Sequence, residues 1–308
     1  MIISLAEETS FAPVASKRTD LPAGNACQYA KLAWLSDIHL DFLDPEQRTT
    51  FYRRLNAIPF DYLLITGDIA TSHELIPVLS ELADTIQRPI GFVLGNHDFY
   101  DSSFYAVRNE LESKLAHHPY LKWLSQEPGY LALNNDVALM GLDSWADGRA
   151  GDYPNSSVVL NDHIRIDDMK HLGKYERLQL MQQLADDAEA QLRKTLPKLL
   201  PHFKTLLLAS HVPLFAESCH GAAESIPEIA YLPHFCWHGG GVALQEELAE
   251  SSSNSHVIAL CGHTHMRTQL DISSRIQIRV SRATYGEPSI HVLDLTKSTI
   301  PQFTLLET

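Results

Sequence analysis

Residues 90–98 read IGFVLGNHD, an apolar run that ends in a glycine followed by an asparagine, a histidine and an aspartate. A short apolar run bounded by glycine is typical of a buried β-strand. Two earlier runs have the same form, because residues 31–36 lead into Asp37-Ile38-His39 and residues 61–66 lead into Gly67-Asp68. Each run therefore ends in side chains that can bind a metal ion or act on a proton.

The second half of the chain repeats this arrangement. Residues 204–210 are apolar and lead into His211, and residues 256–261 lead into Gly262-His263-Thr264-His265. Apolar runs that alternate with helical spacing predict an α/β fold, in which ligands gather at the carboxyl ends of the strands. We predict helices at about 46–57, 72–87, 102–117 and 175–200, and further strands at 130–133, 137–142, 277–280, 289–295 and 302–306.

The ligand-type side chains at these strand ends form one candidate metal site. Carboxylate, imidazole and amide oxygen donors suit manganese, iron, zinc, cobalt or nickel. Seven donors exceed the needs of one ion, so we expect two divalent or trivalent ions that share a carboxylate. Such a pair clamps the oxygens of a phosphoryl displacement and turns a bridging water into a hydroxide nucleophile. The candidate ligands are Asp37, His39, Asp68, Asn96, His211, His263 and His265.

Local spacing predicts how the ligands reach the site. In Asp37-Ile38-His39 and in His263-Thr264-His265, two candidates stand two residues apart. On an extended chain, such residues face the same side. We therefore expect an extended backbone at both pairs, with Ile38 turned into the core.

The five motifs, in this order over about residues 31–295, resemble those of the calcineurin-like metallophosphoesterase superfamily. The resemblance implies an αββα sandwich of two mixed β-sheets flanked by helices. It implies that His97 protonates the leaving oxygen or stabilises the transition state, and it makes Asp98 a second candidate for a catalytic or orienting role. One metal would be bound by Asp37, His39, Asp68 and His265, and the other by Asp68, Asn96, His211 and His263.

The signature is most similar to that of class III cyclic-nucleotide phosphodiesterases and their bacterial relatives. The segment after Gly67-Asp68 reads Ile-Ala-Thr-Ser, which lacks the aspartate and arginine of the phosphoprotein phosphatase branch. We therefore expect a hydrolase whose partner is a small phosphorylated molecule, either a phosphodiester or a phosphomonoester. A protein phosphatase of an unusual branch and a non-catalytic scaffold of the same fold are the alternatives.

We expect residues 1–30 to form a loosely ordered extension and residues 31–308 to form one domain. Insertions at about 143–172 and 216–241 are candidates for reading the substrate, because long loops tied to a site often carry specificity. Trp145 and Trp237 could stack on a ring of the substrate or belong to the core. Gly239–Gly241 could cradle a phosphate before a helix at 242–250 or form a flexible turn, and we favour the turn. The candidate substrate contacts are Arg149, Arg165, His234 and His238.

Composition narrows the class of protein. The 308 residues carry a net charge of −14, which disfavours general nucleic-acid binding, because binding along a phosphate backbone needs a basic surface. No apolar run reaches the ~18–20 residues of a membrane span, so we expect no membrane association. The start of the chain does not resemble a secretory signal, and the four cysteines are widely spaced. These features favour a cytoplasmic protein, and they leave the oligomeric state open.

Overall fold

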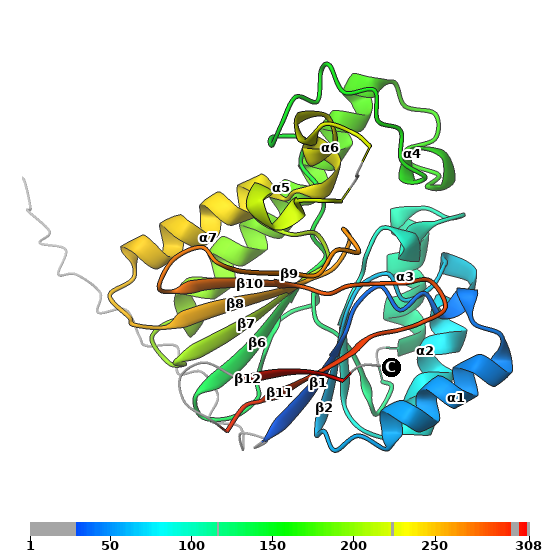
Figure 1. The fold of residues 1–308 in the computed structure, drawn as a ribbon, viewed down its shortest axis with the longest axis vertical. Helices are drawn as coiled ribbons and strands as arrows, with labels where there is room; N and C mark the ends of the chain where they lie inside the picture. Colours follow the sequence, from blue (N-terminus) through cyan, green and yellow to red (C-terminus); the bar gives the residue numbers. More distant parts are fainter. Residues whose placement is uncertain (1–28, 116, 223–224, 297–301, 307–308) are drawn as a thin grey trace, which may run out of the picture.

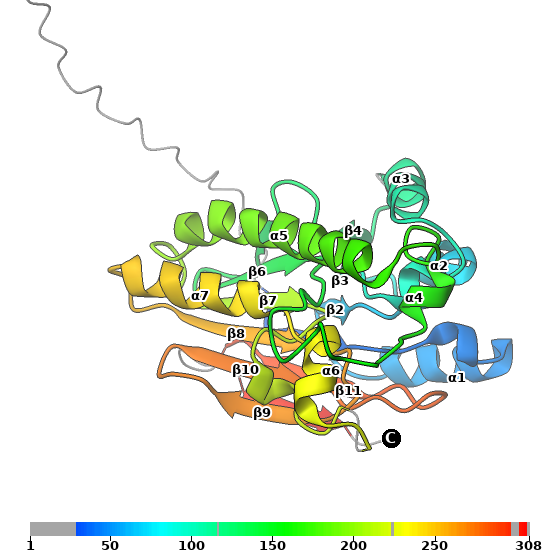
Figure 2. The same cartoon turned by 90° about the horizontal axis from the view of Figure 1, so that it is seen from above.

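The computed structural model describes residues 29–115, 117–222, 225–296 and 302–306. The predicted extension at residues 1–30 therefore lies almost entirely outside the described residues. Two six-stranded mixed sheets form the centre of the molecule, and helices cover the outer face of each (Figures 1 and 2). The predicted αββα sandwich is confirmed.

The first sheet has the order β12-β11-β1-β2-β3-β4. Strands β1 to β4 run parallel to one another, while β11 is antiparallel to both β1 and β12. The bounds are β1 (Lys31–Leu35), β2 (Tyr62–Thr66), β3 (Ile90–Val93), β4 (Leu121–Trp123), β11 (Ile290–Asp294) and β12 (Gln302–Leu306).

The second sheet has the order β5-β6-β7-β8-β10-β9. Its four central strands are parallel and its two edge strands, β5 and β9, are antiparallel to their neighbours. The bounds are β5 (Tyr130–Ala132), β6 (Val137–Leu142), β7 (Thr205–Ser210), β8 (His256–Cys261), β9 (Thr268–Asp271) and β10 (Ile276–Val280).

Alternation along the strands builds two cores. Leu32 and Trp34 of β1 pack between the sheets against residues such as Leu207, whereas Ala33 and Leu35 face the helices. Since successive side chains on a strand point to opposite faces, strands that are buried on both faces read as continuous apolar runs. This is why the strands with the candidate ligands could be recognised in the sequence.

Helices α1, α2 and α3 cover the first sheet, and α5 and α7 cover the second (Figure 1). Asp44 begins α1 by accepting hydrogen bonds from the backbone of Glu46 and Gln47. The helices are α1 (Pro45–Asn56), α2 (Ser72–Ile86), α3 (Phe104–Leu115), α4 (Asp162–Arg165), α5 (Lys174–Leu199), α6 (Glu228–Phe235) and α7 (His238–Glu250). The described residues also form short 3-10 helices, namely η1 (Leu40–Phe42), η2 (His97–Phe99) and η3 (Ala216–Cys219). No helix among the described residues is long and apolar enough to cross a bilayer.

The prediction of a turn at Gly239–Gly241 is wrong, because all three glycines lie inside α7. They allow close packing: a Cβ on Gly240 would stand 2.4 Å from the ring of Trp237, and one on Gly241 would stand 2.4 Å from the Leu214 carbonyl oxygen. The buried carboxylate of Asp147 accepts a hydrogen bond from the Gly239 N–H over 2.6 Å. The amino-terminal end of α7 is therefore already occupied by the carboxylate of Asp147.

Candidate metal centre

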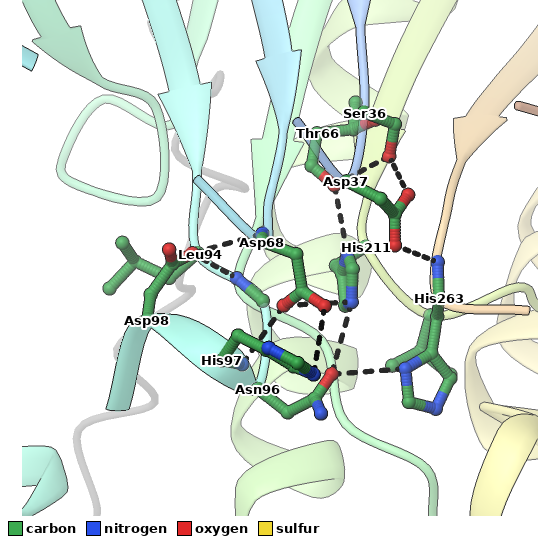
Figure 3. A network of polar contacts seen from close by, with 12 residues as sticks. Ser36, Asp37, Thr66, Asp68, Leu94, Asn96, His97, Asp98, His211 and His263 are labelled. Carbon is green, nitrogen blue, oxygen red and sulfur yellow. Dashed lines mark hydrogen bonds and ion pairs between the residues drawn. The ribbon is translucent and has the colours of Figure 1, made fainter. Parts of the chain in front are cut away.

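Loops after five strands meet at one end of the sandwich, and they come from both sheets. Strands β1, β2 and β3 supply Asp37, His39, Asp68 and Asn96, while β7 and β8 supply the three remaining histidines. The Asp68 carboxylate lies at the centre, with Asn96, His97 and His211 beside it (Figure 3). The structure thus brings all seven predicted ligands together.

Four of these side chains form a compact first group. The ligand atoms of Asp37, His39, Asp68 and His265 all lie within 4.8 Å of one another. His265 Nε2 is 3.4 Å from Asp37 Oδ1 and 3.4 Å from His39 Nε2, and His39 Nε2 is 3.9 Å from Asp68 Oδ2. These four are the residues that the family resemblance assigned to one metal.

The second group surrounds the side-chain oxygen of Asn96. Asn96 Oδ1 lies 3.1 Å from His211 Nε2 and 3.0 Å from His263 Nδ1. His211 Nε2 also lies 3.3 Å from Asp68 Oδ1. Asp68 therefore presents Oδ2 to the first group and Oδ1 to the second, as a bridging carboxylate must.

Backbone carbonyls fix which nitrogen of each histidine faces the second group. His211 Nδ1 lies 2.8 Å from the Thr66 carbonyl oxygen, and His263 Nε2 lies 3.0 Å from the His234 carbonyl oxygen. A ring nitrogen that donates its proton to a carbonyl leaves the other nitrogen with a lone pair for a metal. His211 thus offers Nε2, and His263 offers Nδ1.

Burial and neighbouring charges shift the pKa values of the ligands in the centre. Burial lowers the pKa of His211, but the charge and hydrogen bond of Asp68, together with the charge of Asp37 and the Thr66 carbonyl, raise that pKa to about 10. A metal bound at His211 Nε2 would therefore displace a proton. Burial lowers the pKa of His39 to about 4. For Asp68, burial opposes ionisation, but His211 and His97 hold the pKa well below its ordinary value. Asp68 is therefore a carboxylate, ready to bind cations.

The backbone at the ligands differs from the extended chain that we expected at the two Asp/His-x-His pairs. Five of the seven candidates have left-handed backbone angles, which non-glycine residues adopt rarely. Backbone hydrogen bonds between the loops hold these angles, such as those from Asp37 N to the Gly67 carbonyl and from His39 N to the Asp68 carbonyl. Ile38 is buried, as predicted. The φ values are 51° for Asp37, 41° for His39, 51° for Asp68, 69° for His263 and 57° for His265.

Such angles cost about 1–3 kcal/mol each and persist where the surroundings enforce them, often at functional sites. The donors are carboxylate, imidazole and amide oxygen atoms in two groups that share Asp68. This chemistry fits two divalent cations of the manganese-to-zinc series.

His97 faces the centre without belonging to either group. Its Nε2 lies 3.8 Å from Asp68 Oδ2, and its backbone N–H donates to Asp68 Oδ1 over 2.9 Å. The ring packs on Tyr100, with ring centres 4.2 Å apart. The side chain keeps 13% of its surface exposed, so it can contact a bound molecule.

Asp98 is buried on the far side of the loop. Its two oxygens accept backbone N–H bonds from Gly95, Asp68, Ile69 and Ala70. These contacts connect the loops after β2 and β3 and set the position of Asp68. The placement favours a positioning role for Asp98 over a direct part in the reaction.

The predicted substrate contacts occupy different environments. Arg149 pairs with Asp147 and Asp186, and Arg165 pairs with Asp101 while its guanidinium lies 4.7 Å from the centre of the Tyr100 ring. His234 is buried and His238 is exposed. Trp145 and Trp237 are buried in the core, which excludes stacking on a substrate.

Sequence reasoning missed four residues beside the centre. Asp162 accepts a hydrogen bond from Asn96 Nδ2, and Tyr100 donates to the same carboxylate oxygen. Tyr285 lies over His39, with ring centres 4.6 Å apart, and stacks on Phe42 at the same distance. We call Phe42 and Tyr285 the aromatic ledge; 53% and 47% of their surfaces are exposed. No motif marks these residues, and folding brings Asp162 and Tyr285 to the ligands from distant parts of the chain.

Comparison with known proteins agrees with the geometry. A family model described as calcineurin-like phosphoesterase matches residues 30–267. The structure of phosphopantetheinyl hydrolase from Mycobacterium tuberculosis has a TM-score of 0.60 and 14% identity, over 84% of this chain and 91% of that chain. A dimetal phosphatase from Danio rerio has a TM-score of 0.50 and 13% identity, over 89% and 98%. At these identities the likeness shows the fold alone, and no match was found among curated proteins.

Proposed function

Because this chain belongs to the calcineurin-like phosphoesterase family of metal-dependent hydrolases, we propose that it hydrolyses a small phosphate ester at a two-metal centre. The observation that supports the proposal is the division of the seven candidate ligands into two groups that share Asp68. The first metal would be held by Asp37, His39, Asp68 and His265. The second would be held by Asp68, Asn96, His211 and His263.

Two bound cations would supply charge neutralisation of the phosphate and a hydroxide nucleophile near neutral pH. The protein supplies the rest. Asp68 Oδ1 and Oδ2 face the two groups, and hydrogen bonds from the His97 N–H and to Asp162 keep Asp68 and Asn96 in place before substrate arrives. Such preorganisation is the main source of catalysis in phosphoryl transfer.

His97 is proposed to donate a proton from Nε2 to the leaving oxygen, or to bind a phosphate oxygen through that atom. Histidine suits this task because its ordinary pKa is near neutrality. Packing on Tyr100 fixes the ring, and Nε2 points toward the Asp68 carboxylate between the two groups. His97 is thus within reach of a phosphate that bridges the centre.

The aromatic ledge is proposed to contact the organic part of the ester. Phe42 and Tyr285 stand beside His39 and His265, two ligands of the first group. The residues that follow them, Leu43 and Gly286, line an open groove of about 710 Å³. The apolar or aromatic alcohol part of a bound ester would therefore extend from the centre along this surface.

The experiment compares bis-p-nitrophenyl phosphate with p-nitrophenyl phosphate, after metal-free protein receives Mn²⁺. Metal-dependent hydrolysis of either ester is expected, and the ratio of kcat/KM values assigns a diester or a monoester preference. His97→Asn serves as the matched variant, and it should bind both metals while kcat falls about 10²–10⁴-fold.

Two alternatives have distinct outcomes in the same experiment. Turnover of a phosphopeptide panel well above that of both nitrophenyl esters would favour a protein phosphatase. Absence of hydrolysis with Mn²⁺, Co²⁺, Zn²⁺ or Fe²⁺ would favour a scaffold. The division into a short extension and one domain with two insertions, and a cytoplasmic location, remain predictions that limited proteolysis and cell fractionation would test.

A further inference from the structure

The amide of Asn96 is held from behind by two residues. Its Nδ2 donates to Asp162 Oδ1 over 2.8 Å and to the Tyr100 hydroxyl over 3.2 Å. Tyr100 in turn donates its own proton to Asp162 Oδ1 over 2.7 Å. Asn96, Tyr100 and Asp162 are all buried. Both protons of the amide therefore have acceptors inside the protein.

This network decides which end of the amide faces the second group of ligands. An amide flipped by 180° would place its NH₂ against His211 and His263 and turn its oxygen toward the Asp162 carboxylate. Both contacts would be unfavourable, since donors would face a cation and acceptors would face one another. The Tyr100 hydroxyl donates to Asp162 Oδ1, so its oxygen remains available to accept from the Asn96 amide. Asp162 thus presents Asn96 Oδ1 to the metal position.

The second group also depends on the other insertion. The carbonyl oxygen of His234, in α6, lies 3.0 Å from His263 Nε2 and fixes that ring. The ring of His234 lies 5.5 Å from the ring of His163, the residue after Asp162. Ser156 joins the two segments, because its hydroxyl lies within hydrogen-bonding distance of the Ala230 carbonyl and of His234 Nε2. Segments 143–172 and 216–241 therefore meet behind the second group, and α4 and α6 lie at the same end of the sandwich (Figure 1).

The first group is supported differently. Asp37 Oδ2 accepts a hydrogen bond from Ser36 at the end of β1 over 2.6 Å, and Asp37 Oδ1 accepts one from the His263 N–H over 2.9 Å. These contacts come from the strand ends themselves. The two metal positions thus differ in what holds their ligands.

We propose that Asp162 is the positioning residue for the second metal, so that the insertion at 143–172 sets the affinity of this position while the first position forms without it. The proposal rests on the two-metal centre described above. It gives the insertion a role in building the centre, in addition to any contact with substrate. Residues that hydrogen-bond to the metal ligands, without contacting the metal, typically contribute about 10–100-fold to metal affinity.

The test measures Mn²⁺ binding by calorimetry to metal-free, full-length protein. Asp162→Leu removes both acceptor oxygens and keeps the number of heavy atoms, and Asp162→Asn keeps one acceptor oxygen. We expect Asp162→Leu to bind one Mn²⁺ with wild-type affinity and the second about 10–100-fold more weakly. Asp162→Asn should recover most of the loss. Asp167→Asn, an exposed aspartate of the same insertion, is the matched control and should bind as the wild type does.

Tyr100→Phe covers the case in which Asp162→Leu fails to fold, since it removes one hydroxyl and keeps the ring that packs on His97. Tyr100→Phe should weaken the binding of the second Mn²⁺ and leave the affinity for the first unchanged. Equal weakening of both ions, or an unchanged second affinity, in the folded variants would overturn the proposal. Wild-type protein that binds two ions without hydrolysing esters would refute the proposed function and leave this inference standing. Wild-type protein that binds fewer than two ions would refute both.

Discussion

Replacement of Asp98 by alanine is expected to loosen the loops that carry the metal ligands. Asp98 is fully buried, and its oxygens accept four backbone N–H groups over 2.7–3.1 Å. Two of the donors belong to Asp68 and to Gly95, the residue before Asn96. Loss of the carboxyl therefore removes the contact between the loops that hold the bridging carboxylate and the amide ligand.

The magnitude follows from the four donors. A buried N–H that loses its acceptor costs about 1–3 kcal/mol. Burial and the charge of Asp68 raise the pKa of Asp98 to about 8, so near neutral pH the substitution removes a mostly protonated carboxyl and not a full charge. Water that enters the vacated space accepts hydrogen bonds from some of these N–H groups and offsets part of the loss. We expect a net loss of about 2–4 kcal/mol in the free energy of unfolding.

Urea unfolding of the metal-free protein measures this loss, and a Mn²⁺ titration of the same sample reports the effect on the centre. Asp101→Asn is the control, because Asp101 is exposed, pairs with Arg165 on the surface and has a left-handed φ of 66° that asparagine tolerates. The control should change stability by less than about 1 kcal/mol. Wild-type stability and wild-type metal binding in Asp98→Ala, combined with loss of turnover, would refute the reasoning and make Asp98 a catalytic residue.

Three further predictions follow from the geometry. Gly262→Ala places a Cβ 2.0 Å from Asp37 Oδ2, so it should displace that ligand and abolish binding at the first metal position, measured by calorimetry; Gly173→Ala, whose Cβ meets only Glu176 at 3.3 Å, should bind normally. Tyr285→Ala should raise KM for aryl esters about 3–10-fold with little change in metal content, since ring stacking contributes about 0.5–1.5 kcal/mol; equal KM values in mutant and wild type would remove the ledge from the substrate site. Burial lowers the pKa of His291 from 6.5 to about 4, so its stabilising contribution is complete above pH 6.5 and is lost as the pH falls toward 4. His291→Gln should therefore reduce the loss of unfolding free energy between pH 6.5 and 4 by up to about 3 kcal/mol. Urea unfolding at several pH values measures this loss, and an equal pH dependence in mutant and wild type would contradict the assignment.

The fold could be predicted because the strands with ligands are buried on both faces. Continuous apolar runs such as residues 205–210 mark these strands, and the polar residue that follows each run marks its end. Since parallel strands end at one edge, the order of the motifs was enough to bring Asp37, Asp68 and His211 together. The division into two groups came from the resemblance, and the structure arranges the side chains in the same way.

The rest depends on contacts between segments far apart in the chain. Spacing of two residues suggested extended backbone at Asp37 and His39, but hydrogen bonds from the neighbouring loop impose left-handed angles there. Asp162 stands 66 residues from Asn96, and nothing in its own surroundings in the sequence marks it. The three glycines of α7 suggest a flexible turn in the sequence. In the structure, close packing against Trp237 and Leu214 leaves no room for a Cβ at Gly240 and Gly241.

The central claim is that two metals sharing Asp68 carry out ester hydrolysis. The most direct test measures metal content and Mn²⁺-dependent hydrolysis of bis-p-nitrophenyl phosphate and p-nitrophenyl phosphate in the same samples of wild type and Asp68→Ala. The account predicts two metals per chain with turnover in the wild type, and fewer metals with turnover reduced to background in the variant. Equal metal content and equal rates in the two proteins would contradict it.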